Sequence, residues 1–255
     1  MGYQFIHVEA YAREGSQQSK TDKKTGTISK TKKHSAADIA GEGERKEGHC
    51  DHVAEPKKPN LLYGVSPSAA VTEATAWADN EKDAQGRKLR KDALCLLAGV
   101  VSIGSENADF WDEHKQRTIS WLKQKYGERL KSVIEHTDEE HPHLHFYCVA
   151  KPGERFEKLH DGYKASAEAK RAGKLKGEQN TAYIKAMQTM QDSFYTDVAS
   201  KAGLARLGPK VQRLTRAEWK AKKNANRIEA QARRRDKKIK VREGLQNPAP
   251  DWRMR

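Results

Sequence analysis

The sequence has few cysteines and no long apolar run, and these absences exclude several classes of protein. Its three cysteines, Cys50, Cys95 and Cys148, show no C-x-x-C spacing, which argues against a disulfide framework and for a reducing compartment. The N-terminus lacks the basic start and apolar stretch of a signal peptide. No apolar run approaches the roughly 18 residues of a membrane-spanning helix. A cytoplasmic protein is therefore predicted, with Cys95 and Cys148 buried in apolar segments.

Hydrophobic residues are also scarce over part of the chain. They make up 36% of 255 residues, against 33% charged residues, which is enough for one core but not for a core that spans the whole chain. Large apolar residues almost vanish between Arg13 and Pro59, which indicates a long polar loop or a weakly helical insertion. We therefore expect one domain over residues 1–208, with a polar insertion at about 13–60, followed by an extension over 209–255.

Positive charge gathers at the C-terminal end of the chain. The net charge is +14, and residues 201–255 hold 18 Lys or Arg against 5 Asp or Glu. Such a segment is typical of a polyanion binder. The plain alternative is a solvated helix with a disordered end, and binding to an anionic membrane surface is a third option that lacks a clean apolar face. Residues 215–242 are expected to form a long charged helix.

The spacing of apolar residues predicts an α+β domain with a mostly antiparallel central sheet and flanking helices, plus a basic helical C-terminal extension. Alternating side chains predict a half-buried strand over 3–12, and a continuous apolar run predicts a central strand over 93–103. Helices are expected over 66–79, where Ser66 can cap the first turn before Pro67, over 107–126, ending at Gly127, and over 179–202. Two more strands are expected over 130–136 and 143–150.

Four histidines lie within ten residues, in the string His136-Thr137-Asp138-Glu139-Glu140-His141-Pro142-His143-Leu144-His145. Residues two apart on a strand point the same way, so His143 and His145 share one face over an apolar foundation. A short turn would bring His136 and Glu139 to the same point. Three imidazoles and a carboxylate that converge predict a metal site formed by His136, Glu139, His143 and His145. An exposed polar hairpin without a metal is the alternative.

This histidine string resembles the His-hydrophobic-His (HUH) motif of the rolling-circle nickase superfamily. Its longer pattern, His-x-Asp-Glu-x-x-Pro-His-x-His, is similar to that of the MobV (Mob/Pre) branch of plasmid mobilization relaxases. Arg90-Lys91-Asp92-Ala93 resembles the family's segment before its central strand. The stretch from Gly26 to His34 resembles the family's first motif, a glycine eight residues before a Lys-His pair. The resemblance covers roughly residues 3–208, but Arg45 lies about ten residues beyond the pair, where the family has an Arg within a few residues.

The resemblance implies a metal-dependent, site- and strand-specific DNA nickase that acts at an origin of transfer and initiates plasmid mobilization. A nucleophile would attack the scissile phosphate, release a 3′-hydroxyl and leave the protein on the 5′-phosphate, so that the strand can be resealed without ATP. The implied cofactor is Mn²⁺ or Mg²⁺ as a Lewis acid, and imidazole ligands suit Mn²⁺ better. The implied partners are single-stranded and supercoiled plasmid DNA, and a coupling protein of a type IV secretion system.

The nucleophile and the DNA contacts are also predicted from these stretches. In the MobV branch the histidine of the first motif attacks, which implies His34 here. From the residues alone a tyrosine would be the default, with Tyr3, Tyr11 and Tyr63 as the alternatives. His34 could equally be an ordinary loop histidine beside two lysines. The basic side chains expected to contact DNA phosphates are Lys32, Lys33, Arg45, Arg90, Lys91, Arg206, Lys210, Arg213 and Arg216.

Two other functions are compatible with the same residues. A rolling-circle replication initiator would share the catalytic centre and differ in target and outcome. A non-catalytic DNA-binding protein would use the histidines as a structural metal site and the basic extension for affinity. A second metal site at His49, Cys50, Asp51 and His52 is disfavoured, because these residues lack a partner pair at suitable spacing.

Overall fold

A five-stranded antiparallel sheet forms the centre of the computed structural model, which describes residues 2–21 and 28–208 and scattered positions between 221 and 239. The strands follow the order β1-β5-β7-β6-β4 across the sheet. Every neighbouring pair is antiparallel, which confirms the predicted α+β class. The bounds are β1 (Phe5–Ala12), β4 (Asn60–Gly64), β5 (Leu94–Ser102), β6 (Leu130–His136) and β7 (His143–Cys148).

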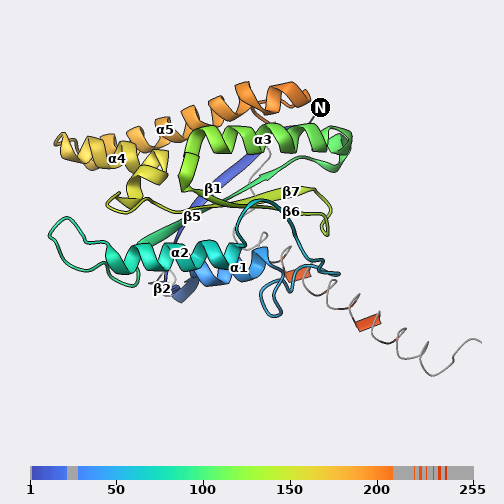
Figure 1. Ribbon diagram of the computed structural model, residues 1–255, viewed down its shortest axis with the longest axis horizontal. Helices are drawn as coiled ribbons and strands as arrows, with labels where there is room; N and C mark the ends of the chain where they lie inside the picture. Colours follow the sequence, from blue (N-terminus) through green and yellow to red (C-terminus); the bar gives the residue numbers. More distant parts are fainter. Residues whose placement is uncertain are drawn as a thin grey trace, which may run out of the picture.

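Helices cover both faces of this sheet (Figure 1). One face carries α1 (Ala36–Gly43) and α2 (Pro67–Asn80), and the other carries α3 (Trp111–Tyr126), α4 (Asp161–Arg171) and α5 (Lys176–Asp197). Short 3₁₀ turns at Ser105–Phe110, Gly127–Arg129, Phe156–Leu159 and Ala199–Ala202 join these elements. Because β5 and β7 lie inside the sheet and between two helical layers, most of their residues are apolar on both faces, and His143 and His145 are the exceptions on β7.

The local signals of the sequence account for most of these elements. Ile6 and Val8 on β1 are buried, whereas Phe5 on the alternate side is exposed, as a half-buried strand requires. The Ser66 hydroxyl accepts a hydrogen bond from the Ala69 backbone N–H at the start of α2. Helix α3 ends at Gly127, whose φ of 54° lies in the left-handed region that favours glycine. The predictions for these strands and helices are confirmed.

The segment between residues 13 and 59 is more ordered than predicted. It holds a two-stranded antiparallel sheet of β2 (Ser16–Thr21) and β3 (Ile28–Lys33), followed by α1. Of the two alternatives, the helical insertion is closer to the structure than the polar loop. The helix was hard to place because α1 buries only small residues, Ala36, Ala40, Gly41 and Gly43, which carry no large apolar signal. Ser35 begins this helix with a reciprocal capping pair to Asp38. Edge strand β4 and the charged helix α4 were also not predicted.

The structure bears on some of the remaining predictions and not on others. All three cysteines are buried, as expected for Cys95 and Cys148. Within the described part of the chain, no helix combines the length and the apolar character needed to cross a membrane. The charged helix expected over 215–242 falls almost entirely outside the described residues, so that prediction stays open.

Candidate metal centre

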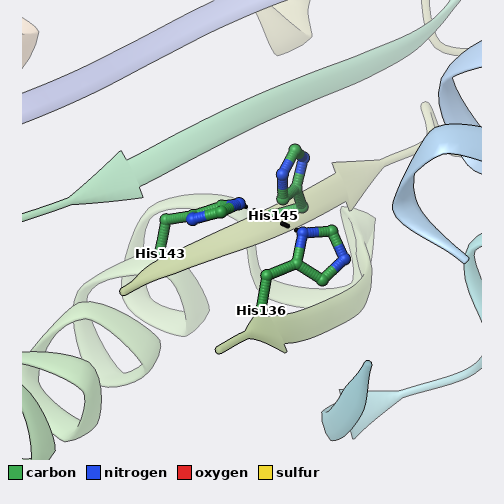
Figure 2. Close-up of side chains that lie close together, drawn as sticks. All are labelled: His136, His143 and His145. Carbon is green, nitrogen blue, oxygen red and sulfur yellow. Dashed lines mark hydrogen bonds between the residues drawn. The ribbon is translucent and has the colours of Figure 1, made fainter. Parts of the chain in front are cut away.

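The histidines of the β6–β7 hairpin lie side by side on one face of the sheet. His136 on β6 is paired directly with His143 on β7, and His145 is paired with Ile134. Directly opposed residues of antiparallel strands face the same way, as do residues two apart on one strand. All three imidazoles therefore project toward the layer of α1, and their rings converge (Figure 2). One ring nitrogen from each lies within 4.8 Å of the others, as ligation of a single ion requires.

Two backbone carbonyls fix where the protons sit on His136 and His143. Nε2 of His136 donates to the Gly43 carbonyl at 2.7 Å, and Nδ1 of His143 donates to the His141 carbonyl at 2.9 Å. A carbonyl only accepts, so in each neutral ring the other nitrogen keeps its lone pair. These two lone pairs, on Nδ1 of His136 and Nε2 of His143, face each other across 3.1 Å. They repel unless a proton lies between them, as in a hydrogen bond, or a metal ion lies beside them, so the donor set fits a metal ion.

Burial and nearby positive charge favour the neutral form of two of these rings. Burial, with the Arg45 guanidinium adding to the effect, lowers the pKa of His136 to about 4. Burial also lowers the pKa of His145 well below its usual range, and the neighbouring His136 and His143 rings act in the same direction. Neutral imidazole is the form that binds metals. At neutral pH both rings can therefore ligate without first losing a proton.

A buried arginine ties the acidic turn of the hairpin to the end of α1. The Arg45 side chain is only 3% exposed and donates to both carboxylate oxygens of Asp138, at 2.9 and 2.8 Å, and to Oε1 of Glu139 at 2.6 Å. Arg45 also adopts a φ of 57°, which non-glycine residues rarely do. Burial alone would raise the pKa of Asp138, but the hydrogen bonds from Arg45 and the Lys57 backbone outweigh it and lower the pKa.

Glu139 lies between this arginine and the histidines. Its Oε1 is 3.6 Å from Nε2 of His143. Ligand atoms of His136, Asp138 and Glu139 also come within 4.8 Å of one another. The structure thus brings together all four predicted ligands. Whether Glu139 ligates an ion in addition to its bond to Arg45 stays a prediction.

The structure places His34 apart from this cluster. His34 is exposed and precedes α1, with its Nδ1 4.0 Å from Oδ2 of Asp38. The other end of α1 is the one that reaches the cluster, because its last residue, Gly43, is bonded to His136. Eight helical residues span about 12 Å. His34 is also absent from the lining of the hollow beside His143 and His145, so a shared action of His34 and the cluster on one phosphate stays a prediction.

The three tyrosines weighed as alternatives have different surroundings. Tyr3 lines one hollow together with His143 and His145. Tyr11 is half-buried on β1 and donates to Oε2 of Glu9 at 3.1 Å, and burial raises its pKa. Tyr63 on β4 lies under the ammonium group of Lys123 from α3, on the face of the sheet opposite the histidines. Of these tyrosines, Tyr3 is the one beside the cluster.

The basic residues expected to bind DNA divide into three groups. Arg90, Lys91 and Arg206 pair with the nearby carboxylates of Asp92, Glu14 and Asp192 at the surface. Lys33 is exposed at the end of β3, whereas the Lys32 side chain, together with Lys210, Arg213 and Arg216, falls outside the described residues. Arg45 is instead buried in the ion pairs given above. Contact of any of these residues with DNA stays a prediction.

Two features of the site gave no usable signal in the sequence. The Gly43 carbonyl, which orients His136, is a backbone group and carries no residue-type pattern. His52 was weighed only as part of a separate metal site, but its Nε2 lies 3.8 Å from Oε1 of Glu42 and 3.9 Å from Oε1 of Glu139. It lines the same hollow as His143 and His145, so His52 belongs to the rim of the hairpin cluster.

Replacement of Gly43 by alanine is expected to weaken metal binding. A Cβ at this position would lie 2.1 Å from the Tyr147 hydroxyl and 3.3 Å from Cδ1 of Ile134, both of which are buried. The end of α1 must shift, and the bond from His136 to the Gly43 carbonyl is lost. Loss of such an outer partner typically costs roughly 10- to 100-fold in metal affinity. Calorimetric titration with Mn²⁺ measures it.

Gly177 provides the matched control for this substitution. It lies in the first turn of α5, and a Cβ there meets no atom within 4 Å. Gly177→Ala should bind Mn²⁺ as the wild type does. A folded Gly43→Ala variant with unchanged Mn²⁺ affinity would show that the carbonyl does not set the ligand geometry.

Comparison with known proteins gives two similar solved structures. No protein-family model and no curated protein matches the sequence. One similar structure is the MobM relaxase domain (MOBV; Mob_Pre) bound to 26-nucleotide pMV158 oriT DNA, with 14% identity over 85% of this chain and 99% of that chain and a TM-score of 0.49. The other is the same domain, Mn-bound and with 23-nucleotide plasmid pMV158 oriT DNA, with 16% identity over 81% and 96% of the two chains and a TM-score of 0.45.

Proposed function

We propose that this protein is a relaxase that nicks one strand of supercoiled plasmid DNA at an origin of transfer and stays covalently attached to the 5′-phosphate. The convergence of three imidazoles, two of them held by carbonyls with their lone pairs face to face, carries the proposal. These histidines stand in the string that resembles the MobV pattern. A structural metal site alone would not need the open hollow onto which His143 and His145 face.

The metal would be held by His136, His143 and His145, with Glu139 beside them. A divalent ion bound there supplies Lewis-acid polarisation of the scissile phosphate. Nitrogen donors suit Mn²⁺ better than Mg²⁺, which prefers oxygen. We therefore propose Mn²⁺. The protein's own contribution is to orient the imidazoles of His136 and His143 through backbone carbonyls, and to favour the neutral form of His136 and His145, before DNA arrives.

The covalent step is a transesterification at phosphorus, for which we propose His34. One of its ring nitrogens forms the new bond to phosphorus while the bond from phosphorus to the 3′-oxygen breaks, and the leaving oxygen takes a proton from solvent. The Asp38 carboxylate lies 4.0 Å from Nδ1 of His34, and a small side-chain rotation would let it accept a hydrogen bond from that nitrogen and leave Nε2 to attack. His34 does not line the hollow beside the cluster, whereas Tyr3 does.

An acid-labile protein–DNA adduct is the expected result of the test. Supercoiled plasmid is incubated with the protein and Mn²⁺ at neutral pH, and open circles and covalent adduct are measured with and without EDTA. An adduct on His34 is a phosphoramidate, which brief acid treatment destroys, whereas a phosphotyrosine survives. His34→Ala should form no adduct, and Tyr3→Phe, Tyr11→Phe and Tyr63→Phe should form it normally.

His49→Ala is the matched control, because His49 also lies 4.0 Å from the Asp38 carboxylate but is outside the family motif. It should form the adduct as the wild type does. An acid-stable adduct that disappears in one tyrosine variant would move the nucleophile to that tyrosine. A protein that binds DNA but never nicks it would instead support the non-catalytic alternative.

The proposed role in plasmid transfer differs from replication initiation in the DNA site that is nicked and in the outcome of nicking. Both activities use the same chemistry, so a nicking assay does not distinguish them. The two are distinguished by measuring the frequency of plasmid transfer between cells alongside the plasmid copy number within a cell. A role in transfer also predicts contact with a coupling protein of a type IV secretion system.

A further inference from the structure

A row of residues runs across the sheet from the histidine cluster to the edge strand. His136, His143, Ser102 and Phe5 are paired in succession across β6, β7, β5 and β1. Directly opposed residues of antiparallel strands share a face. Phe5 therefore lies on the same face as the proposed metal ligands, two strands from His143. At the usual strand spacing this is about 10 Å.

The aromatic rings at the end of this row face solvent. Phe5 is 52% exposed and Tyr3 is 43% exposed. Both line one hollow together with His143 and His145. Ile6 and Val8, on the opposite face of β1, supply the strand's contribution to the core. The fold therefore does not need Phe5 for packing, and its ring is free to contact a ligand beside the cluster.

The basic extension of the chain starts next to the same rings. Tyr3 forms a β-bridge with Ala205, and the Ala205 N–H donates to the Gly2 carbonyl at 2.9 Å. Gly208 lies close enough that a Cβ on it would be 3.4 Å from the Tyr3 ring. Residues 209–255, which continue from this point, hold 16 Lys or Arg against 5 Asp or Glu. Aromatic faces together with a strongly basic segment of the same chain are a combination that binds single-stranded nucleic acid.

The charged residues that line the hollow indicate whether the Tyr3 and Phe5 rings would contact the bases or the phosphates of a DNA strand. Glu42, Glu139 and Glu140 line it. The Arg45 guanidinium also lines it but is already paired with Asp138 and Glu139, so carboxylates, which repel phosphates, predominate. The flat faces of bases are uncharged and tolerate this surface. A phosphate is attracted only where a metal ion on the histidines offsets the carboxylates. Next to the cluster the rings are therefore suited to bases and not to the backbone.

We propose that Phe5, supported by Tyr3, is a stacking shelf for a base of the single-stranded DNA, adjacent to the phosphate at the histidine cluster. This inference rests on the proposed function, because it assumes that the hollow receives a DNA strand. Phe5 acts as a positioning residue, since it touches the base and not the reacting atoms.

Loss of stacking should weaken the binding of single-stranded DNA by the full-length protein. The probe is a fluorescein-labelled dT oligonucleotide with Mn²⁺ present, so that the histidine cluster can carry its ion. Binding is measured by anisotropy on probe that a denaturing gel shows to be uncleaved. Stacking on one ring contributes about 1–3 kcal/mol, so Phe5→Ala should lose roughly 5- to 150-fold in affinity. Phe5→Trp should keep it. Phe110→Ala removes an aromatic ring that is 49% exposed but lies outside the hollow, and should leave affinity unchanged.

A photocrosslink identifies the contact directly. The same oligonucleotide with 5-iododeoxyuridine should crosslink to the peptide that contains Tyr3 and Phe5. The proposal is contradicted if Phe5→Ala binds the oligonucleotide as tightly as the wild type. It is also contradicted if Phe5→Ala binds more tightly, which is the result expected if the C-terminal extension covers the ring. If the wild type and Phe5→Ala both nick DNA and bind it with equal affinity, the stacking role of Phe5 is wrong and the proposed function stands. If the wild type never nicks DNA but Phe5→Ala binds it more weakly, the stacking role stands and the proposed function is wrong.

Discussion

The double variant His143→Ala, His145→Ala should lose DNA nicking altogether while it keeps most of its affinity for single-stranded DNA. Both imidazoles belong to the three-nitrogen cluster, and a single remaining histidine cannot hold the ion in place. The loss of Mn²⁺ affinity should exceed the roughly 10- to 100-fold typical of outer-partner changes. Binding of the strand should persist, because phosphate contacts elsewhere dominate affinity for DNA.

Plasmid nicking, Mn²⁺ calorimetry and anisotropy on one preparation of each variant measure these three effects. His141→Ala is the matched control within the same hairpin. It removes an imidazole that accepts from the Ser105 N–H at 3.1 Å, but it keeps the backbone carbonyl that orients His143. This variant should nick normally. Nicking at the wild-type rate by the double variant, with Mn²⁺ present, would show that the cluster is not the catalytic centre.

The fold could be predicted where one residue type carries the signal. The period-two pattern of β1 and the apolar run of β5 gave the sheet, and Gly127 gave the end of α3. Helix α1 could not be found in this way because its buried face consists of alanine and glycine. Its capping pair, Ser35 with Asp38, was visible in the sequence but was set in a stretch dominated by polar residues.

The histidine cluster was predictable because β6 and β7 are joined by a short turn. Strand geometry alone places His143 and His145 on one face, and the turn then limits where His136 can lie. The shell around the cluster depends instead on contacts between distant segments. The Gly43 carbonyl and the Arg45 guanidinium come from α1 and its end, and each lies 93 residues before the hairpin residue that it contacts. No local pattern specifies such pairings.

Arg45 should therefore act mainly through the protein and not through DNA phosphates, and Arg45→Ala is expected to be strongly destabilising. Its guanidinium is 3% exposed, and the Asp138 carboxylate to which it is bonded is 1% exposed. Removal of one partner leaves a buried carboxylate without a counter-charge, which costs about 3–5 kcal/mol of unfolding free energy. Arg45→Lys should recover part of the loss, because lysine keeps the charge but not the two-nitrogen contact. Urea unfolding measures all of these variants.

Two controls test whether the loss of stability in Arg45→Ala comes from the unpaired buried charge. One is an exposed ion pair with the same geometry, and the other is a second substitution at Asp138. Arg90 donates to both oxygens of Asp92 at 2.9 and 2.8 Å, but the two side chains are 83% and 55% exposed. Arg90→Ala should therefore cost less than about 1 kcal/mol. Adding Asp138→Asn to Arg45→Ala removes the unpaired charge, so the double variant should be more stable than Arg45→Ala alone. Equal losses for Arg45→Ala and Arg90→Ala, or no recovery in the double variant, would mean that the buried pair does not hold the hairpin to α1.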